Sequence, residues 1–181
     1  MKVDLFKPVL IENIEEITKE ITAYADKFMH VAKNFYQLDQ ADFLKNCPLV
    51  KSWIARSGLE LQDCILVVIV PRKLDPNIHI DTIPKFGMQR TSLNIPIRNC
   101  EDSETKIYKL IKGNTIKKST IDGSEYIAFS EGAEFEEIAS YKLDVPTAIN
   151  IVNPHGIINY GNKPRISLSL RFVLEPPWLY E

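Results

Sequence analysis

The sequence lacks the features that mark several large classes of protein. It has only three cysteines, Cys47, Cys64 and Cys100, and no Cys-x-x-Cys pair. This excludes the usual zinc-thiolate motif and favours a reduced chain without structural disulfides. The longest apolar run, Ile65–Val70, is far too short to span a bilayer. The first ten residues include Asp4 and no long apolar core, so we expect no secretory signal and a cytoplasmic location.

An excess of charge of either sign is also missing. The formal net charge is -2 and the pI is about 6.0, so nothing indicates a nucleic-acid or membrane partner. The length of 181 residues, without repeats or linkers, predicts a single domain over residues 1–181.

Helical patterns occur only in the first third of the chain. Between residues 10 and 38, apolar side chains recur at steps of three and four, which predicts one long helix that includes His30. Asn13 and Glu16 form a candidate capping pair at its start. A second helix is predicted over residues 48–57, with Pro48 in its first turn and Gly58 at its exit.

Strand patterns dominate the rest of the chain. The run from Cys64 to Val70 predicts a buried strand. Further short strands are expected at residues 79–82, 91–98, 105–111, 125–130, 147–153 and 165–173, between clusters of Gly, Pro, Asn and Asp. Helices followed by many strands predict an α+β, mainly β fold: a double-stranded β-helix, or jelly-roll/cupin-like barrel, over residues 64–173, with buttressing helices in residues 1–60.

Two of these strands have a polar face. Arginine and serine alternate with apolar residues along Arg165–Phe172, and Arg90–Arg98 has the same pattern. An exposed face is one interpretation. In a small barrel, however, one face of each strand points into the lumen, and a polar lumen that contains arginine is a binding pocket.

Two of the three histidines form a candidate metal site. His79 and Asp81 are two residues apart, so on a strand both side chains project from the same face. His155 follows in the segment Asn153–Gly156. Two histidines and one carboxylate match the facial triad of non-haem iron(II) oxygenases, which leaves coordination positions open. A His-x-acid pair alone is a weak signal.

A candidate anion-binding pair follows ten residues after His155. Residues 159–164 predict a hairpin turn, which would bring Arg165 roughly across from His155. An arginine can bind a carboxylate with two parallel hydrogen bonds, and Ser167, on the same strand face, adds a hydroxyl donor.

Together, His79-x-Asp81, distal His155 and Arg165-x-Ser167 resemble the motif of the iron(II)/2-oxoglutarate-dependent dioxygenase superfamily. The order of helices and strands is also similar, and the segment Arg90–Arg98 resembles the aspartyl/asparaginyl and prolyl hydroxylase-like branches. The resemblance implies Fe(II) on the triad, 2-oxoglutarate with its distal carboxylate on Arg165 and Ser167, O2 as oxidant, and succinate and CO2 as products. The implied reaction is hydroxylation of an amino acid or peptidyl side chain in a small-molecule or peptide substrate.

The sequence is compatible with more than one function and with more than one role for several residues. A cupin-type isomerase or epimerase, or a non-catalytic ligand-binding barrel, is the alternative function. Arg90 and Asn94 are further candidates for binding co-substrate or substrate, as is Arg98 for substrate, and all three are equally compatible with roles within the barrel. Trp178 and Tyr180 either cap the pocket or pack against the core. The acidic segment Glu131–Glu137 is expected to be a solvated, inserted loop.

Overall fold

Antiparallel strands make up most of the structure, a computed structural model that describes residues 4–28, 34–74, 76–81, 90–119 and 125–180. Within these ranges the helices are α1 (Ile14–Ala25), α2 (Gln40–Asn46), α3 (Pro48–Arg56) and a short 3-10 helix, η1 (Pro177–Leu179). The strands are β1 (Phe6–Pro8), β2 (Phe35–Gln37), β3 (Leu61–Ile69), β4 (Ile80–Asp81), β5 (Thr91–Arg98), β6 (Ser103–Lys112), β7 (Thr115–Ser119), β8 (Glu125–Phe129), β9 (Glu134–Tyr141), β10 (Thr147–Asn150), β11 (His155–Asn159) and β12 (Arg165–Phe172). No helix among the described residues is long and apolar enough to cross a membrane.

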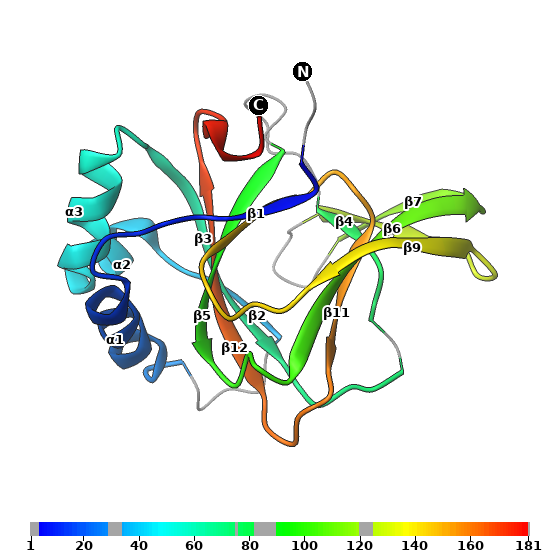
Figure 1. Ribbon diagram of the computed structural model, residues 1–181, viewed down its shortest axis with the longest axis horizontal. Coiled ribbons are helices and arrows are strands. Elements are labelled where there is room, and N and C mark those ends of the chain that lie inside the picture. Colours follow the sequence, from blue (N-terminus) through cyan, green and yellow to red (C-terminus); the bar gives the residue numbers. More distant parts are fainter. Residues whose placement is uncertain (1–3, 29–33, 75, 82–89, 120–124, 181) are drawn as a thin grey trace.

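The strands form three sheets. The largest has the order β1-β10-β5-β12-β3-β2, and the two smaller ones have the orders β11-β6-β9 and β4-β8-β7. An isolated antiparallel bridge between His79 and His155 connects the two smaller sheets. Figure 1 shows the helices on one side of the large sheet and strands β6, β9 and β11 on the other. The prediction of a mainly β fold with N-terminal helices is confirmed in this form.

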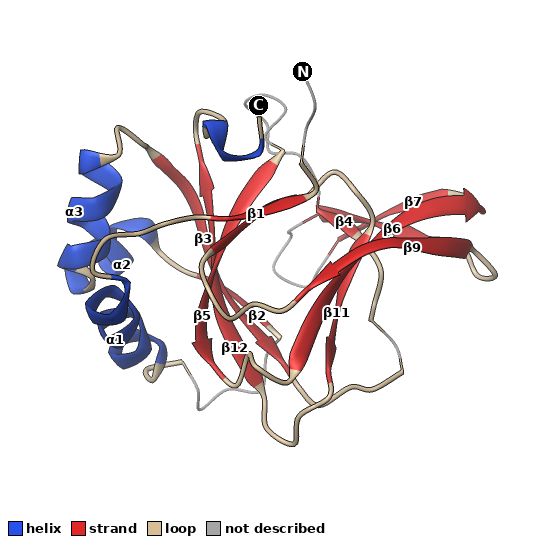
Figure 2. Ribbon diagram, in the orientation of Figure 1, coloured by secondary structure: helices blue, strands red, loops and turns tan. Residues whose placement is uncertain are grey.

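The alternation along β12 separates two environments. Ile166, Leu168, Leu170 and Phe172 belong to the main core, where they pack with the helices, and Figure 2 shows those helices gathered on that side. The intervening residues, Arg165, Ser167, Ser169 and Arg171, face the opposite side of the sheet. A second, smaller core lies there, and it includes Ile107, Tyr141 and Ile149.

The predicted long helix is wrong in its second half. Helix α1 ends at Ala25, and Phe35–Gln37 is a strand that pairs with Val67–Ile65 of β3. Apolar spacing alone fits both states, but pairing with a buried strand outweighs local helix propensity. The capping pair is also absent, because Asn13 has a φ of 57° and makes no side-chain cap. His30 lies outside the described residues.

The helix predicted at residues 48–57 is confirmed, with Pro48 in its first turn and Gly58 in the left-handed conformation after it. The sequence patterns missed α2, whose start is capped by the Asp39 side chain at 2.8 Å from the Asp42 amide. Trp178 packs against Trp53 and Phe172, so it contributes to the core.

The acidic segment Glu131–Glu137 is only partly the loop that was expected, because residues 131–133 form a turn and the rest belongs to a strand. Residues Glu134–Tyr141 form β9, which pairs with β6 along almost its whole length. Lys106 and Lys112 on β6 form ion pairs with Glu137 and Glu134, at 2.7 and 3.3 Å. Charge complementarity with the neighbouring strand therefore accounts for the run of glutamates.

Candidate metal centre

The three predicted ligands converge on one point. His79 lies directly before β4, Asp81 ends β4, and His155 begins β11. Each residue offers one ligand atom, and these atoms lie within 4.8 Å of one another. The two imidazole rings have centroids 4.8 Å apart, so the His-x-Asp pair and the distal histidine form a single cluster.

The backbone fixes both histidines relative to each other. His79 and His155 exchange two backbone hydrogen bonds of 2.9 Å. Each ring also places Nδ1 near the carbonyl two residues earlier, at 2.8 Å from Asn77 and 2.9 Å from Asn153. A carbonyl only accepts, so Nδ1 must be the donor in each ring, and Nε2 is left available to bind a metal.

Asp81 is held from two sides. Its Oδ1 lies 3.3 Å from Nε2 of His79, and its Oδ2 lies 2.6 Å from Nη2 of Arg171 on β12. Burial alone would raise the pKa of the carboxyl, but Arg171 and His79 outweigh it and hold that pKa far below its usual range. The carboxyl of Asp81 is therefore an anion at neutral pH.

The pKa values of the two histidines shift in opposite directions. Burial, together with the neighbouring His79, lowers the pKa of His155 to about 4, so its imidazole is neutral at pH 7 and can coordinate a metal. For His79, burial also favours the neutral form, but the hydrogen bond and charge of Asp81 raise its pKa overall. Metal binding to His79 would therefore compete with protonation of this ring.

A glycine allows the strand of His155 to approach the segment before His79. A Cβ built on Gly156 would lie 2.4 Å from the carbonyl oxygen of Pro76. The Ile157 amide donates to this same carbonyl, at 3.1 Å. Only a residue without a side chain permits this approach.

We therefore expect Gly156→Ala to separate the two strands that carry His79 and His155. The overpacking should destabilise the fold by about 1–3 kcal/mol and weaken metal binding. Denaturant unfolding and a metal titration measure the two effects. Stability within about 0.5 kcal/mol of wild type and unchanged metal affinity would contradict the proposed role of this contact.

A second cluster of polar groups lies in the smaller core. Arg165 is 1% exposed, and its Nε and Nη1 have no hydrogen-bond partner among the described residues. The buried hydroxyl of Tyr141 is also without one. Burial raises the pKa of this tyrosine, while the nearby Thr105, Arg165 and Asn94 act in the opposite direction, which places these groups together. Unpaired buried donors are costly unless a ligand satisfies them.

The strand register gives the separation of the two clusters. His155 pairs with Ile107, while Thr105, two residues along β6, pairs with Tyr141 of β9. Two residues along a strand correspond to about 6.6 Å, and side chains two apart share a face. Tyr141 and His155 lie on the two opposite neighbours of β6, so they are also two strand spacings, about 9.6 Å, apart across the sheet, and both face the same interior.

The other predicted site residues lie in different places. Ser167 is buried on the same strand face as Arg165, and Asn94 lies near Tyr141. Arg98 pairs with Ile166, the neighbour of Arg165, whereas Arg90 lies at the opposite end of β5. The backbone amide of Arg90 donates to Glu175. The strand register therefore places Arg90 and Arg165 at opposite ends of β5, and the role of Arg90 in binding co-substrate or substrate stays a prediction.

Two further residues considered for the pocket make contacts elsewhere. Arg98 forms a two-pronged ion pair with Asp26, after the end of α1, at 2.6 and 3.0 Å. Its guanidinium therefore binds on the helix side of the large sheet. The Tyr180 hydroxyl donates to Glu175 at 3.2 Å, close to the end of β5 that carries Arg90.

The predicted hairpin is wrong, because the strands before and after residues 160–164 do not pair with each other. Strand β11 pairs with β6, and β12 pairs with β3 and β5, so residues 160–164 connect two different sheets. Asn159 holds this connection through its side chain, which donates to the carbonyls of Ile69 and Lys163. The turn residues were recognised correctly, but a turn does not specify which strands pair.

Three residues at the site were not identified from the sequence. Tyr141 was missed because β9 was not among the predicted strands. Tyr126 pairs with Asp81 across β4 and β8, and its ring is edge-on to His79 with centroids 6.3 Å apart. Arg171 belongs to the alternating face of β12, which was the one available signal, but nothing in the sequence pairs it with Asp81.

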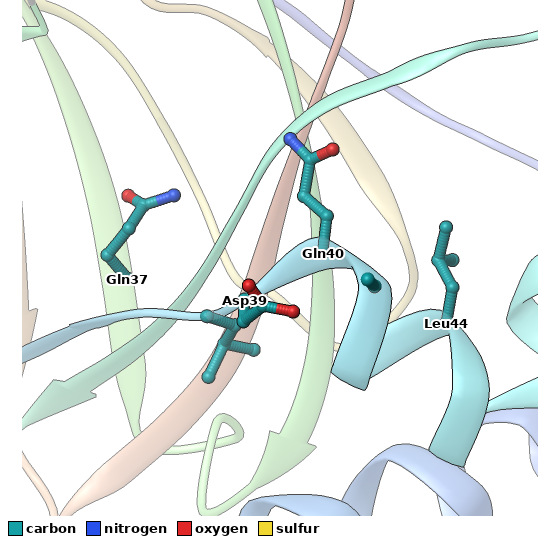
Figure 3. Close-up of a pocket in the computed structure, with 6 residues that line it drawn as sticks. Gln37, Asp39, Gln40 and Leu44 are labelled. Atoms are coloured by element: carbon teal, nitrogen blue, oxygen red, sulfur yellow. The ribbon is translucent and has the colours of Figure 1, made fainter.

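A hollow at the start of α2 lies apart from these clusters. Figure 3 shows this surface pocket with its polar side chains, and its lining consists of Gln37, Leu38, Asp39, Gln40, Ala41 and Leu44. Those polar groups already bind neighbours: Gln37 donates to Asp63, Asp39 caps α2, and Gln40 donates to the Gln62 carbonyl. None of the triad residues lines it.

Comparison with known proteins finds similarity in structure but not in sequence. No family model matches the chain, and no curated protein matches it. SnoK, a non-heme alpha ketoglutarate dependent carbocyclase from nogalamycin biosynthesis, superposes with a TM-score of 0.52 at 10% identity, over 92% of this chain and 78% of SnoK. AviO1 from Streptomyces viridochromogenes Tue57 gives 0.51 at 12% identity, over 98% and 94% of the two chains.

A third structure carries ligands of interest. The epimerase SnoN, in complex with Fe3+, alpha ketoglutarate and nogalamycin RO, has a TM-score of 0.51 at 12% identity, over 91% of this chain and 76% of SnoN. At such identities the likeness concerns the fold. The predicted resemblance to iron(II)/2-oxoglutarate dioxygenases is confirmed at that level.

Proposed function

We propose that this protein is an iron(II)- and 2-oxoglutarate-dependent oxygenase, built as a single double-stranded β-helix barrel with supporting helices. The observation that supports it best is the presence of two clusters in one interior: a His-Asp-His triad and a buried arginine, Arg165, whose Nε and Nη1 have no hydrogen-bond partner among the described residues. Neither an isomerase of the cupin type nor a ligand-binding barrel requires both.

The triad suits a divalent first-row metal. Two imidazoles with Nε2 available and one carboxylate supply three ligands, a set characteristic of non-haem iron(II) enzymes. The carbonyls of Asn77 and Asn153 orient the rings, as is usual around metal-binding histidines. His79, Asp81 and His155 would thus hold Fe(II) and leave positions open for other ligands.

The buried donors suit the far end of 2-oxoglutarate. Nε and Nη1 of Arg165 and the hydroxyl of Tyr141 have no hydrogen-bond partner in the part of the chain that the structure describes, and a carboxylate could accept from both residues. Ser167 and Asn94 are the additional polar groups that we assign to this pocket. A five-carbon dicarboxylate held there would extend toward the triad, since the strand register places Tyr141 and His155 on the same face of one sheet.

The bound metal and co-substrate supply the oxidative chemistry, in which O2 and 2-oxoglutarate are converted to succinate, CO2 and an oxidant for the substrate. The protein contributes position and exclusion of water. Arg165 and Tyr141 orient the co-substrate, and the apolar side chains of Ile107, Ile149 and Ile151, each no more than 1% exposed, keep the interior dry.

Hydroxylation of an amino acid or peptidyl side chain is the reaction that we propose first. SnoK and SnoN, however, are a carbocyclase and an epimerase, so a reaction without oxygen insertion is the second candidate. The mass of the product separates the two: hydroxylation adds one oxygen atom, whereas oxidative cyclisation removes two hydrogens and epimerisation leaves the mass unchanged.

The direct test is release of succinate from 2-oxoglutarate. We expect slow release that requires Fe(II) and O2, and faster release when a panel of amino acids, peptides and small natural products includes the substrate. Chelation of the metal should stop it. Succinate release that persists under chelation would contradict the proposed function.

A further inference from the structure

Among the described residues, Arg171 forms one ion pair, with the carboxylate of the triad. Its Nη2 lies 2.6 Å from Oδ2 of Asp81, and its side chain is 12% exposed. Its Nε is buried without a hydrogen-bond partner within the same parts of the chain. The ion pair with Asp81 is therefore the contact that positions this guanidinium.

The two oxygens of Asp81 are consequently not equivalent. Oδ1 faces Nε2 of His79 at 3.3 Å, on the side where the other ligand atoms gather, whereas Oδ2 faces Arg171. A charged hydrogen bond of this length is among the stronger interactions of a carboxylate. A metal at the triad would meet Oδ1, while Oδ2 is already engaged.

This asymmetry matters for how many positions the metal keeps open. A free carboxylate can bind a cation with one oxygen or with both. A second bond from Asp81 would take a position that the 2-oxo acid or oxygen needs. An arginine that holds Oδ2 prevents this without being a ligand itself.

Building on the proposed function, we infer that Arg171 is a positioning residue that keeps Asp81 a one-oxygen ligand and so preserves an open coordination position for 2-oxoglutarate. The contact is made by a single nitrogen, so an ammonium can replace it. Arg165 differs in this respect, because a planar fork is needed to bind a carboxylate in two-pronged fashion.

A positioning role of Arg171 and a merely structural role predict different changes in the affinities for metal and for 2-oxoglutarate. Loss of Arg171 removes a positive charge beside the metal, so the affinity for the metal alone should stay the same or increase. Binding of 2-oxoglutarate to the metal-loaded protein should instead weaken by at least about tenfold, because Asp81 now competes for its position. A partly unfolded variant would lose both affinities together.

The experiment uses the full chain loaded anaerobically with Co(II), whose visible absorption reports coordination number. Arg171→Met, Arg171→Lys and wild type are titrated first with Co(II) and then with 2-oxoglutarate. Arg98→Gln is the matched control, since it breaks another arginine–aspartate pair of 2.6 Å, on the helix side of the sheet. Circular dichroism checks folding, and Arg171→Gln replaces the methionine variant if that one does not fold.

We expect the methionine variant to bind Co(II) with an altered spectrum and to bind 2-oxoglutarate at least about tenfold more weakly. The lysine variant and the control should resemble wild type. Unchanged spectra and unchanged 2-oxoglutarate affinity in the methionine variant would overturn the inference alone. Failure of wild type to bind Co(II) would overturn the proposed function, and this inference with it.

Discussion

Replacing Asp81 with alanine should abolish metal binding and, with it, succinate release. Asp81 is the single anionic group in the triad, and its low pKa keeps it charged at neutral pH. Loss of an outer-shell partner of a metal site already costs about 10- to 100-fold in affinity, so loss of the charged ligand should exceed about 100-fold. Calorimetric titration with Mn(II), which avoids oxidation, measures this directly.

The same change leaves Arg171 without its partner, so stability must be checked separately. Asp81→Asn keeps the shape of the side chain and is the milder variant. Asp26→Ala is a suitable control, because Asp26 pairs with Arg98 on the helix side of the large sheet, away from the triad. If a folded Asp81→Ala protein binds Mn(II) as wild type does, Asp81 is not a ligand.

The second large effect concerns Arg165, whose replacement by alanine should weaken 2-oxoglutarate binding while metal binding survives. A hydrogen bond to a charged group contributes about 1.5–3 kcal/mol, and 1.4 kcal/mol corresponds to about tenfold in affinity. We therefore expect the 2-oxoglutarate requirement to rise at least about tenfold. Titration of 2-oxoglutarate at fixed iron, read as succinate release, gives this value.

Neighbouring variants show whether the effect is specific. Arg165→Lys should recover only part of the loss, because it keeps the charge but not the planar fork. Tyr141→Phe and Ser167→Ala should cause smaller shifts in the same direction. Identical titration curves for Arg165→Ala and wild type would mean that the dicarboxylate is bound elsewhere. Loss of iron binding as well would indicate misfolding around β12. In that case the 2-oxoglutarate titrations of Tyr141→Phe and Ser167→Ala would show whether this pocket binds the dicarboxylate.

The triad could be predicted from sequence because part of its geometry is local. Residues two apart on a strand share a face, so His79 and Asp81 follow directly from their spacing. Arg165 and Ser167 follow from the same rule along β12. The choice of His155 was aided by the scarcity of histidine, since the chain has three.

The missed features depend on contacts between distant segments. The Arg171–Asp81 pair joins residues 90 positions apart, and Tyr141 reaches Arg165 only because β9 pairs with β6. Phe35–Gln37 became a strand for the same reason, through pairing with β3. Periodicity describes each segment alone and does not specify its partner strand.

The account is tested most directly by a crystal structure of the protein soaked anaerobically with Mn(II) and 2-oxoglutarate. We expect one ion with Nε2 of His79, one oxygen of Asp81 and Nε2 of His155 at about 2.0–2.4 Å. The distal carboxylate of 2-oxoglutarate should lie on Arg165 and Tyr141. An ion bound elsewhere, or a co-substrate that does not contact Arg165, would contradict the proposed function.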